Sequence, residues 1–316
     1  MNILRKLMWK VLGISSLNVQ LKALAHKYDE QIDTLHFFLN TLVDIKSFPK
    51  DWDKDLYIMQ QCDVQLLRIV DALLRKHNID YWLDYGTLLG AIRHGGFIPW
   101  DDDMDISTTS DNYDKIKDVL PKELAQFNID FKVSDGRIGI SYNHEKTGIW
   151  LDVFEYDELK SCETIKQLKY ELDKKNKLWL KKAIPFSKKK TEKEMTSLKK
   201  YMFELPGQGN HNYLLLSPTY FWPRVFVFEE SNIFPVKNIS FAGYLFKAPA
   251  NAEICLQECY GKSFMLFPKS GVLHHDMGRG PLSTWAKLGG VDMYQVHEYL
   301  KDIADQLSDK AEQIEV

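Results

Sequence analysis

The sequence predicts an α+β protein in which helices flank a sheet, and three segments indicate where the strands lie. Residues 79–94, IDYWLDYGTLLGAIRH, join a short aromatic and β-branched run to a glycine and then to good helix formers. Residues 101–107, DDDMDIS, and 148–157, GIWLDVFEYD, both have the two-residue alternation of a strand. Longer stretches with helical spacing precede and follow these segments.

The composition excludes several classes of protein. The 316 residues are 45% hydrophobic, which is enough to bury a full-sized core, and the formal charge of -3 gives no field that would attract nucleic acid. Four scattered cysteines do not form a disulfide framework, so the cytosol is the expected compartment. The N-terminus lacks the features of a signal peptide, and no apolar run reaches the roughly 18 residues of a membrane span.

Residues 1–55 are predicted to form an N-terminal helical arm. Gly13, Ser15 and Ser16 are expected to divide it into two helices. The first turns carry an apolar face opposite a basic face, and apolar side chains then recur at heptad spacing, at Leu7, Ile14, Leu21, Tyr28, Leu35 and Leu42. Three interpretations remain open: a helix packed on its own domain, a helix docked on an anionic membrane surface, or a coiled coil that makes a homo-oligomer.

The main domain is predicted to span residues 56–290. It begins with a helix to about Lys76, which leads into a strand, turn and helix unit. Gly86 is expected to end the strand, so that backbone N–H groups at the helix start can face a phosphate, while Thr87 adds a hydroxyl. A simple helix cap would have the same sequence. Arg93, further along this helix, is a candidate phosphate contact or a surface residue.

The acidic run is the strongest chemical signal. Strand alternation places Asp103 and Asp105 on one face and Met104 on the opposite, buried face. Two neighbouring carboxylates repel each other unless a cation lies between them, and hard oxygen ligands suit Mg²⁺ or Mn²⁺. Asp101 and Asp102 are ranked as secondary. The alternative is a solvated acidic turn.

A third carboxylate is expected at Asp152. In the strand that contains it, Trp150 and Asp152 share one face. Residues 137–154 are predicted to form an antiparallel hairpin that contains this strand. The alternative is an aspartate hydrogen-bonded for structural reasons. Metal-assisted phosphoryl chemistry is the leading hypothesis for Asp103, Asp105 and Asp152 together.

The stretch YWLDYGTLLGAIRHGGFIPWDDDMDI closely resembles the signature of the LicD family of phosphocholine transferases, to which the fukutin-related proteins are also similar. The segments WLDVFEYD, IFPVKNISFAGYLFKAP and CYGKSFMLFP look like further blocks of this family, so the resemblance covers about residues 60–275. It implies a nucleotidyltransferase-like mixed β-sheet, with the metal-binding carboxylates at Asp103, Asp105 and Asp152.

The resemblance also implies a reaction. Family members transfer a phospho-alcohol, typically phosphocholine, from a CDP-activated donor such as CDP-choline to a hydroxyl of a cell-surface glycan: teichoic acid, lipopolysaccharide or a capsule precursor. CMP is released. A quaternary ammonium donor needs aromatic faces, for which Trp100 and Trp150 are candidates, although both can simply pack. His274 and His275 are further candidates for binding the donor phosphate.

Two other segments complete the chain. A lysine-rich helical insert is predicted at about residues 157–215, either as a solvated helix or as a basic face for a membrane or a phosphate-bearing acceptor. Residues 291–316 are expected to form a C-terminal packing helix. The predicted location is cytoplasmic, with peripheral attachment to the inner face of the cytoplasmic membrane. Two other functions remain open: true nucleotidyl transfer, and an inactive scaffold that binds a nucleotide or a membrane.

Overall fold

The structure is a computed structural model that describes residues 14–134, 137–183, 209–216, 225–268 and 290–312. The chain separates into two compact units. The first comprises Met1–Phe48 with Phe264–Val272, and the second comprises Pro49–Ser263 with Leu273–Val316. The first unit therefore ends slightly earlier than the arm predicted at residues 1–55.

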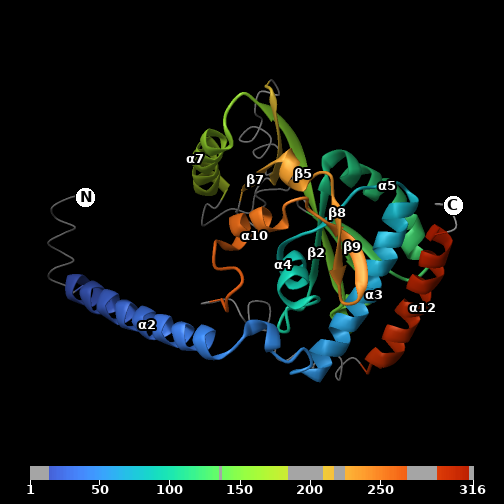
Figure 1. Ribbon diagram of the computed structural model, residues 1–316, viewed down its shortest axis with the longest axis horizontal. Coiled ribbons are helices and arrows are strands. Elements are labelled where there is room, and N and C mark those ends of the chain that lie inside the picture. Colours follow the sequence, from blue (N-terminus) through green and yellow to red (C-terminus); the bar gives the residue numbers. More distant parts are fainter. Residues whose placement is uncertain (1–13, 135–136, 184–208, 217–224, 269–289, 313–316) are drawn as a thin grey trace. The chain divides into compact units, whose positions relative to one another are not determined.

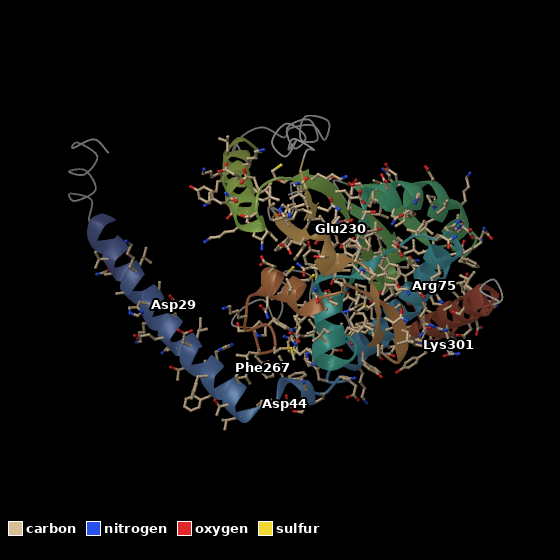
Figure 2. All side chains as sticks on the ribbon, turned by 45° about the horizontal axis from the view of Figure 1, so that its top comes forward. Asp29, Asp44, Arg75, Glu230, Phe267 and Lys301 are labelled. Carbon is tan, nitrogen blue, oxygen red and sulfur yellow. The ribbon has the colours of Figure 1, made fainter. Side chains whose placement is uncertain are left out.

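The first unit is built on the long helix α2 (Ile14–Leu42), followed by the short 3-10 helix η1 (Ile45–Ser47). Ser15 and Ser16 lie inside α2, so the predicted break is wrong at these serines, while Gly13 lies outside the described residues. Phe267, labelled in Figure 2, joins the unit: its carbonyl oxygen accepts a hydrogen bond from the His36 ring at 2.6 Å, and its N–H donates to Asn40 at 2.8 Å. The heptad positions from Leu21 to Leu42 stay exposed within this unit.

Among the described residues, the second unit contains a mixed sheet of seven strands. The strands are β1 (Trp82–Leu83), β2 (Met104–Thr109), β3 (Asp130–Ser134), β4 (Arg137–Ser141), β5 (Trp150–Ser161), β6 (His211–Leu216) and β7 (Phe226–Glu229). They are ordered β1-β2-β5-β4-β3, while β6 pairs with the second half of β5 and β7 pairs with β6. The β2–β5 pair is parallel and the other pairs are antiparallel. The predicted hairpin at 137–154 is present as β4 and β5.

Helices cover both faces of this sheet, as Figure 1 shows. The described helices of this unit are α3 (Lys54–Lys76), α4 (Tyr85–His94), α5 (Ser110–Ala125), α6 (His144–Thr147), α7 (Ile165–Ala183), α9 (Glu230–Ile233), α10 (Ala252–Tyr260) and α12 (Met293–Glu312). In Figure 1, α4 and α10 lie on one side of β2 and β5, and α3, α5 and α12 lie on the other. A separate hairpin is formed by β8 (Lys237–Phe241) and β9 (Tyr244–Ala248). The predicted α+β class, with helices around a mixed sheet, is confirmed.

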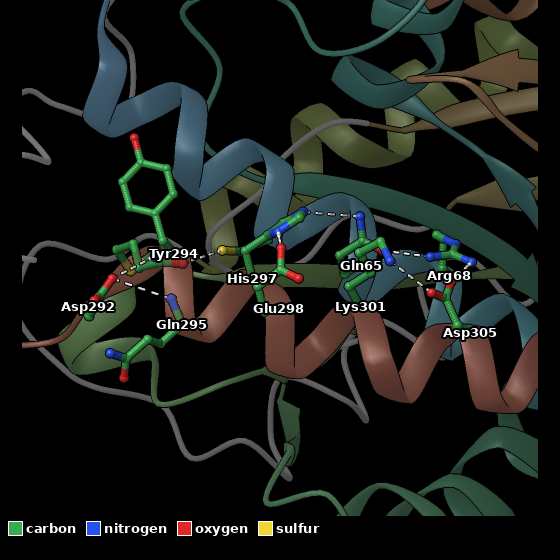
Figure 3. A network of polar contacts seen from close by, with 11 residues as sticks. Gln65, Arg68, Asp292, Tyr294, Gln295, His297, Glu298, Lys301 and Asp305 are labelled. Atoms are coloured by element: carbon green, nitrogen blue, oxygen red, sulfur yellow. Dashed lines mark hydrogen bonds and ion pairs between the residues drawn. The ribbon is translucent and has the colours of Figure 1, made fainter.

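The C-terminal helix α12 is held against α3 by a polar network that Figure 3 shows in detail. Arg68 on α3 donates to Gln65 at 2.7 Å and to Asp305 on α12 at 2.6 Å, and Lys301 pairs with the second oxygen of Asp305 at 3.0 Å. The Arg68 guanidinium also lies 4.2 Å from the centroid of the Tyr244 ring. This helix is therefore fixed to the helix that lies behind the acidic strands.

The lysine-rich insert differs from its predicted limits. Residues 157–161 continue β5, and residues 211–216 form β6, which pairs with them, so both ends of the predicted helical segment are strands. A helix, α7, does begin at Ile165, and residues 184–208 lie outside the described part of the chain. The strand runs on because Tyr156 and Leu159 are buried, which charge density alone does not reveal. No helix in the described ranges is long and apolar enough to cross a membrane.

Candidate active site

The site is built on the central parallel strands β2 and β5. Asp105 and Asp152 are direct register partners, so their side chains leave the sheet from the same face, side by side. Asp103 precedes β2 by one residue and therefore has the same alternation. One carboxylate oxygen from each of these three residues lies within 4.8 Å of the others. The three carboxylates that the sequence singled out thus converge on one point.

The rest of the acidic run overlaps with this group. Carboxylate oxygens of Asp101, Asp102 and Asp103 also lie within 4.8 Å of one another, so Asp103 belongs to both groups. Burial raises the pKa of Asp105 well above its ordinary range, and the negative charges of Asp103, Asp152 and Asp101 raise it further. The clustered carboxylate oxygens and their mutual repulsion fit a hard divalent cation such as Mg²⁺ or Mn²⁺.

Gly86 occupies a different position from the one predicted. It does not end β1, which stops at Leu83, but is the second residue of α4. A Cβ atom at this position would lie 2.5 Å from Oδ2 of Asp101, so glycine is needed for the carboxylate to approach the helix start. Thr87 is also engaged with the acidic strand, because its Oγ1 accepts the Asp105 N–H at 2.7 Å. Both residues thus position the carboxylates.

Asp84 anchors the start of α4 and was not identified from the sequence. One of its oxygens accepts the Tyr85 N–H at 2.9 Å, and the other accepts the Ser107 hydroxyl at 2.7 Å and the Tyr156 hydroxyl at 3.0 Å. Its side chain is buried, and burial raises its pKa. Asp84 therefore connects the helix to both β2 and β5. The signal for it was an aspartate at the N-cap position before a helix-forming run.

Asp152 is held by a donor on each oxygen. The Trp150 indole Nε1–H donates to Oδ1 at 2.6 Å, and Arg137 donates to Oδ2 at 2.6 Å. Burial raises the pKa of Asp152 to about 6, although Arg137 and Trp150 oppose this effect. The Trp150 ring packs over Gly139, where a Cβ would lie 2.3 Å from a ring carbon. Trp150 is therefore a positioning residue for Asp152, whatever else it contacts.

Asp63, on α3, accepts a hydrogen bond from the backbone of β5, the strand that carries Asp152. It is fully buried, and its Oδ1 accepts the Trp150 backbone N–H at 2.9 Å, whereas its Oδ2 has no hydrogen-bond partner. Burial is the largest cause of its strongly raised pKa, and the charges of Asp103 and Asp102 add to it. This role could not be predicted from the sequence, because Asp63 looks like any polar residue of an amphipathic helix.

Arg93 and Trp100 lie together beside the cluster. Arg93 is buried, so the alternative of a surface helix residue is wrong. Its Nε–H donates to His94 at 3.0 Å, and its guanidinium lies 5.9 Å from the centroid of the Trp100 ring. Burial lowers the pKa of Arg93 to about 10, against the opposing effects of Tyr260 and Asp101. His274 and His275 lie outside the described residues.

A mixed sheet whose parallel central strands bring three carboxylates together, with a helix starting beside them, is the arrangement of a nucleotidyltransferase-type domain. Comparison with known families agrees: residues 78–176 match the family described as LicD/FKTN/FKRP, nucleotidyltransferase domain. Residues 78–176 thus match this family, and the resemblance predicted from the sequence is confirmed.

Individual relatives match parts of the chain. The lipopolysaccharide cholinephosphotransferase LicD of Haemophilus influenzae is 37% identical over 109 residues, which cover 30% of this chain and 41% of that protein. The human ribitol 5-phosphate transferase FKRP is 51% identical over 39 residues, 12% of this chain and 8% of that protein. An uncharacterized protein of Rickettsia prowazekii is 47% identical over 58 residues, 18% and 22% of the two chains. The chain thus matches less than half the length of each of these relatives.

Proposed function

We propose that this protein is a phosphotransferase that moves phosphocholine, or a related phospho-alcohol, from a CDP-activated donor to a hydroxyl of a cell-surface glycan. The convergence of Asp103, Asp105 and Asp152 inside the segment that matches the LicD family is the observation that carries the proposal. The named relatives transfer cholinephosphate and ribitol 5-phosphate, which supports a phospho-alcohol as the transferred group. Lipopolysaccharide, teichoic acid and capsule precursors are the candidate acceptors.

In the proposed reaction, an acceptor hydroxyl oxygen bonds to the phosphorus that carries the alcohol. The bond from that phosphorus to the bridging oxygen breaks, CMP leaves with this oxygen, and the hydroxyl proton is lost to solvent. Mg²⁺ or Mn²⁺ held by the three carboxylates would neutralise negative charge on the donor pyrophosphate as that bond breaks.

The chain's own residues have distinct tasks in this proposal. Asp103, Asp105 and Asp152 are the catalytic residues and the metal ligands. Because each oxygen of Asp152 already accepts one hydrogen bond, a fixed ligand suits it better than a proton carrier. Arg93 and the first turn of α4 at Gly86 and Thr87 are proposed to meet the donor phosphates. Trp100 and Trp150 are proposed to border the alcohol group.

Product identification tests the reaction class. The purified chain is incubated with Mg²⁺ and CDP-choline, CTP or ATP, and the nucleotides released are separated. CMP from CDP-choline supports phospho-alcohol transfer, whereas pyrophosphate from CTP or ATP would assign nucleotidyl transfer instead. Asp105→Asn should abolish Mn²⁺ binding and turnover, and Asp130→Asn, on the exposed β3, serves as the matched control. An Asp105→Asn variant with normal metal binding and turnover would contradict the site.

Donor choice is tested separately. Choline, ribitol and glycerol donors share the nucleotide and both phosphates, so they differ only in contacts with the alcohol. Calorimetric titration with CDP-choline, CDP-ribitol and CDP-glycerol in the presence of Mg²⁺ should give the tightest binding for CDP-choline if Trp100 and Trp150 face the ammonium. Equal affinities would remove the role proposed for the two tryptophans.

We also propose that the protein attaches peripherally to the anionic inner face of the cytoplasmic membrane. The exposed apolar positions of α2 and the exposed lysines of α7 support it. Sedimentation with vesicles that contain phosphatidylserine, compared with vesicles of phosphatidylcholine alone, measures the attachment. Light scattering in the same buffers measures the alternative, a homo-oligomer through α2.

A further inference from the structure

The ion pair between Arg137 and Asp152 joins an accessible cation to a buried carboxylate. Arg137 is the first residue of β4, and its Nη1 atom lies 2.6 Å from Oδ2 of Asp152. The Arg137 side chain is 41% exposed, whereas that of Asp152 is 4% exposed. The guanidinium therefore reaches from solvent into the carboxylate cluster, and a guanidinium has five N–H donors, more than this one ion pair uses.

Arg137 pairs with a carboxylate that a divalent cation in this site would also bind. The carboxylate it pairs with lies within 4.8 Å of the oxygens of Asp103 and Asp105. A cation bound among these oxygens would repel the guanidinium and neutralise its partner, so the ion pair would weaken. The long side chain can then turn away without leaving the site, because its guanidinium already lies 5.9 Å from the centroid of the Trp150 ring.

We infer that Arg137 is an exchangeable counter-ion: it neutralises Asp152 while the site is free of metal and, once a divalent cation takes that charge, binds a phosphate of the nucleotide donor. This inference rests on the proposed function and adds a donor-binding residue to it. Guanidinium groups bind phosphate oxygens in a planar, two-point geometry, which gives Arg137 a task that the carboxylates cannot perform.

The inference predicts opposite effects on two affinities. In Arg137→Gln, the competing cation is absent, so Mn²⁺, measured by electron paramagnetic resonance without nucleotide, should bind about fivefold more tightly or better. The same variant lacks the phosphate contact, so CDP, titrated by calorimetry with saturating Mg²⁺, should bind about tenfold more weakly. A residue that only holds Asp152 in place would weaken both affinities when removed.

Arg75 offers a matched control. Its Nη2 atom lies 2.7 Å from Oδ2 of Asp71. The two side chains are 35% and 6% exposed, close to the values for Arg137 and Asp152. Neither Arg75 nor Asp71 belongs to the acidic groups around Asp103. Arg75→Gln should therefore leave the affinities for both Mn²⁺ and CDP unchanged, even if the variant melts at a lower temperature.

Arg137→Lys keeps the test informative if Arg137→Gln does not fold. Lysine retains the positive charge but not the planar group, so Mn²⁺ affinity should stay at the wild-type value while CDP affinity falls. The inference is overturned if the wild-type chain binds Mn²⁺ but the Arg137 variants change both affinities in the same direction or neither. If the wild-type chain binds no Mn²⁺, the proposed function fails, and this inference fails with it.

Discussion

Asp105 and Asp152 are register partners on the parallel strands β2 and β5, so two carboxylates leave the sheet side by side on the same face. Burial raises the pKa of both carboxyl groups, and the negative charge of Asp103 raises both further. The folded chain therefore carries unfavourable charge at neutral pH that a cation or protons can neutralise.

The first prediction concerns the pH dependence of stability. Asp152 has its pKa raised from 3.8 to about 6, so between these values the folded chain binds more protons than the unfolded chain. Stability must then rise as the pH falls through 6, and Asp152 alone corresponds to about 3 kcal/mol. In EDTA, the melting temperature is expected to increase between neutral pH and about pH 4.5, and excess Mg²⁺ should flatten the profile by raising its neutral end.

Groups elsewhere act in the opposite sense but in a lower range. Glu123 and Asp305 have lowered pKa values because of hydrogen bonds from Lys76 and Arg68. The stability they contribute is lost only as the pH falls through their lowered values, below the range used here. Asp152→Asn should reduce the increase seen in EDTA. A melting temperature that falls steadily on acidification through pH 6, in the wild-type chain without metal, would contradict the raised pKa of Asp152.

The second prediction concerns the indole of Trp150. Trp150→Phe keeps an aromatic ring over Gly139 but removes the Nε1–H that donates to Asp152. Without this neutral donor the Asp152 carboxylate loses one of the two groups that fix its orientation, so Mn²⁺ should bind about tenfold more weakly at neutral pH. Tyr81→Phe is the control, because it removes a 2.7 Å hydrogen bond to the buried Asp71 away from the site. Equal Mn²⁺ affinities in Trp150→Phe and wild type would contradict the positioning role.

Much of the fold could be predicted because it depends on local patterns. Strand alternation was enough to place Asp103 and Asp105 on one face, and the same rule applied to Asp152 on a distant strand. That β2 and β5 are parallel neighbours in direct register is a property of the tertiary fold. The family resemblance implied only a mixed sheet that carries these carboxylates. The roles of these residues in metal binding and catalysis stay predictions until they are measured.

The residues that the sequence did not reveal act through long-range contacts. Arg137 and Asp63 reach Asp152 and the backbone of Trp150 from other elements, and no spacing in the chain encodes either contact. Gly86 was predicted to end a strand and expose backbone N–H groups to a phosphate, whereas in the structure it is the second residue of α4 and allows a carboxylate to come close. The group that approaches it is the carboxylate of Asp101, which the sequence argument had ranked as secondary.

The third prediction tests this close approach. In Gly86→Ala, the new Cβ would lie 2.5 Å from Oδ2 of Asp101, so the carboxylate must move. Alanine is otherwise favourable inside a helix by up to about 1 kcal/mol, so a loss of stability or of metal binding would come from this collision. We expect turnover to fall by at least about tenfold, because small displacements at a reacting centre lower the rate by such factors. Gly96→Ala is the control, since its Cβ would meet Ala242 at 3.6 Å or more, an ordinary contact. Similar turnover in the two variants would contradict the prediction.

The fourth prediction separates the charge of Asp63 from its hydrogen bond. Burial raises the pKa of Asp63 well above its ordinary range, which favours the neutral side chain over the charged one. Asp63→Asn keeps an oxygen that can accept the Trp150 N–H, and we expect nearly wild-type stability, Mn²⁺ binding and turnover. Asp63→Leu has a similar volume but no acceptor, so it leaves the buried N–H unpaired at a cost of about 1–3 kcal/mol in the free energy of unfolding. Its Mn²⁺ affinity should also fall, because the start of β5 carries both Trp150 and Asp152.

Urea denaturation and Mn²⁺ titration of the Asp63→Asn and Asp63→Leu variants test this prediction. If Asp63→Asn is as damaging as Asp63→Leu, the negative charge of Asp63 is what the site requires, and the neutral hydrogen-bonding role is wrong.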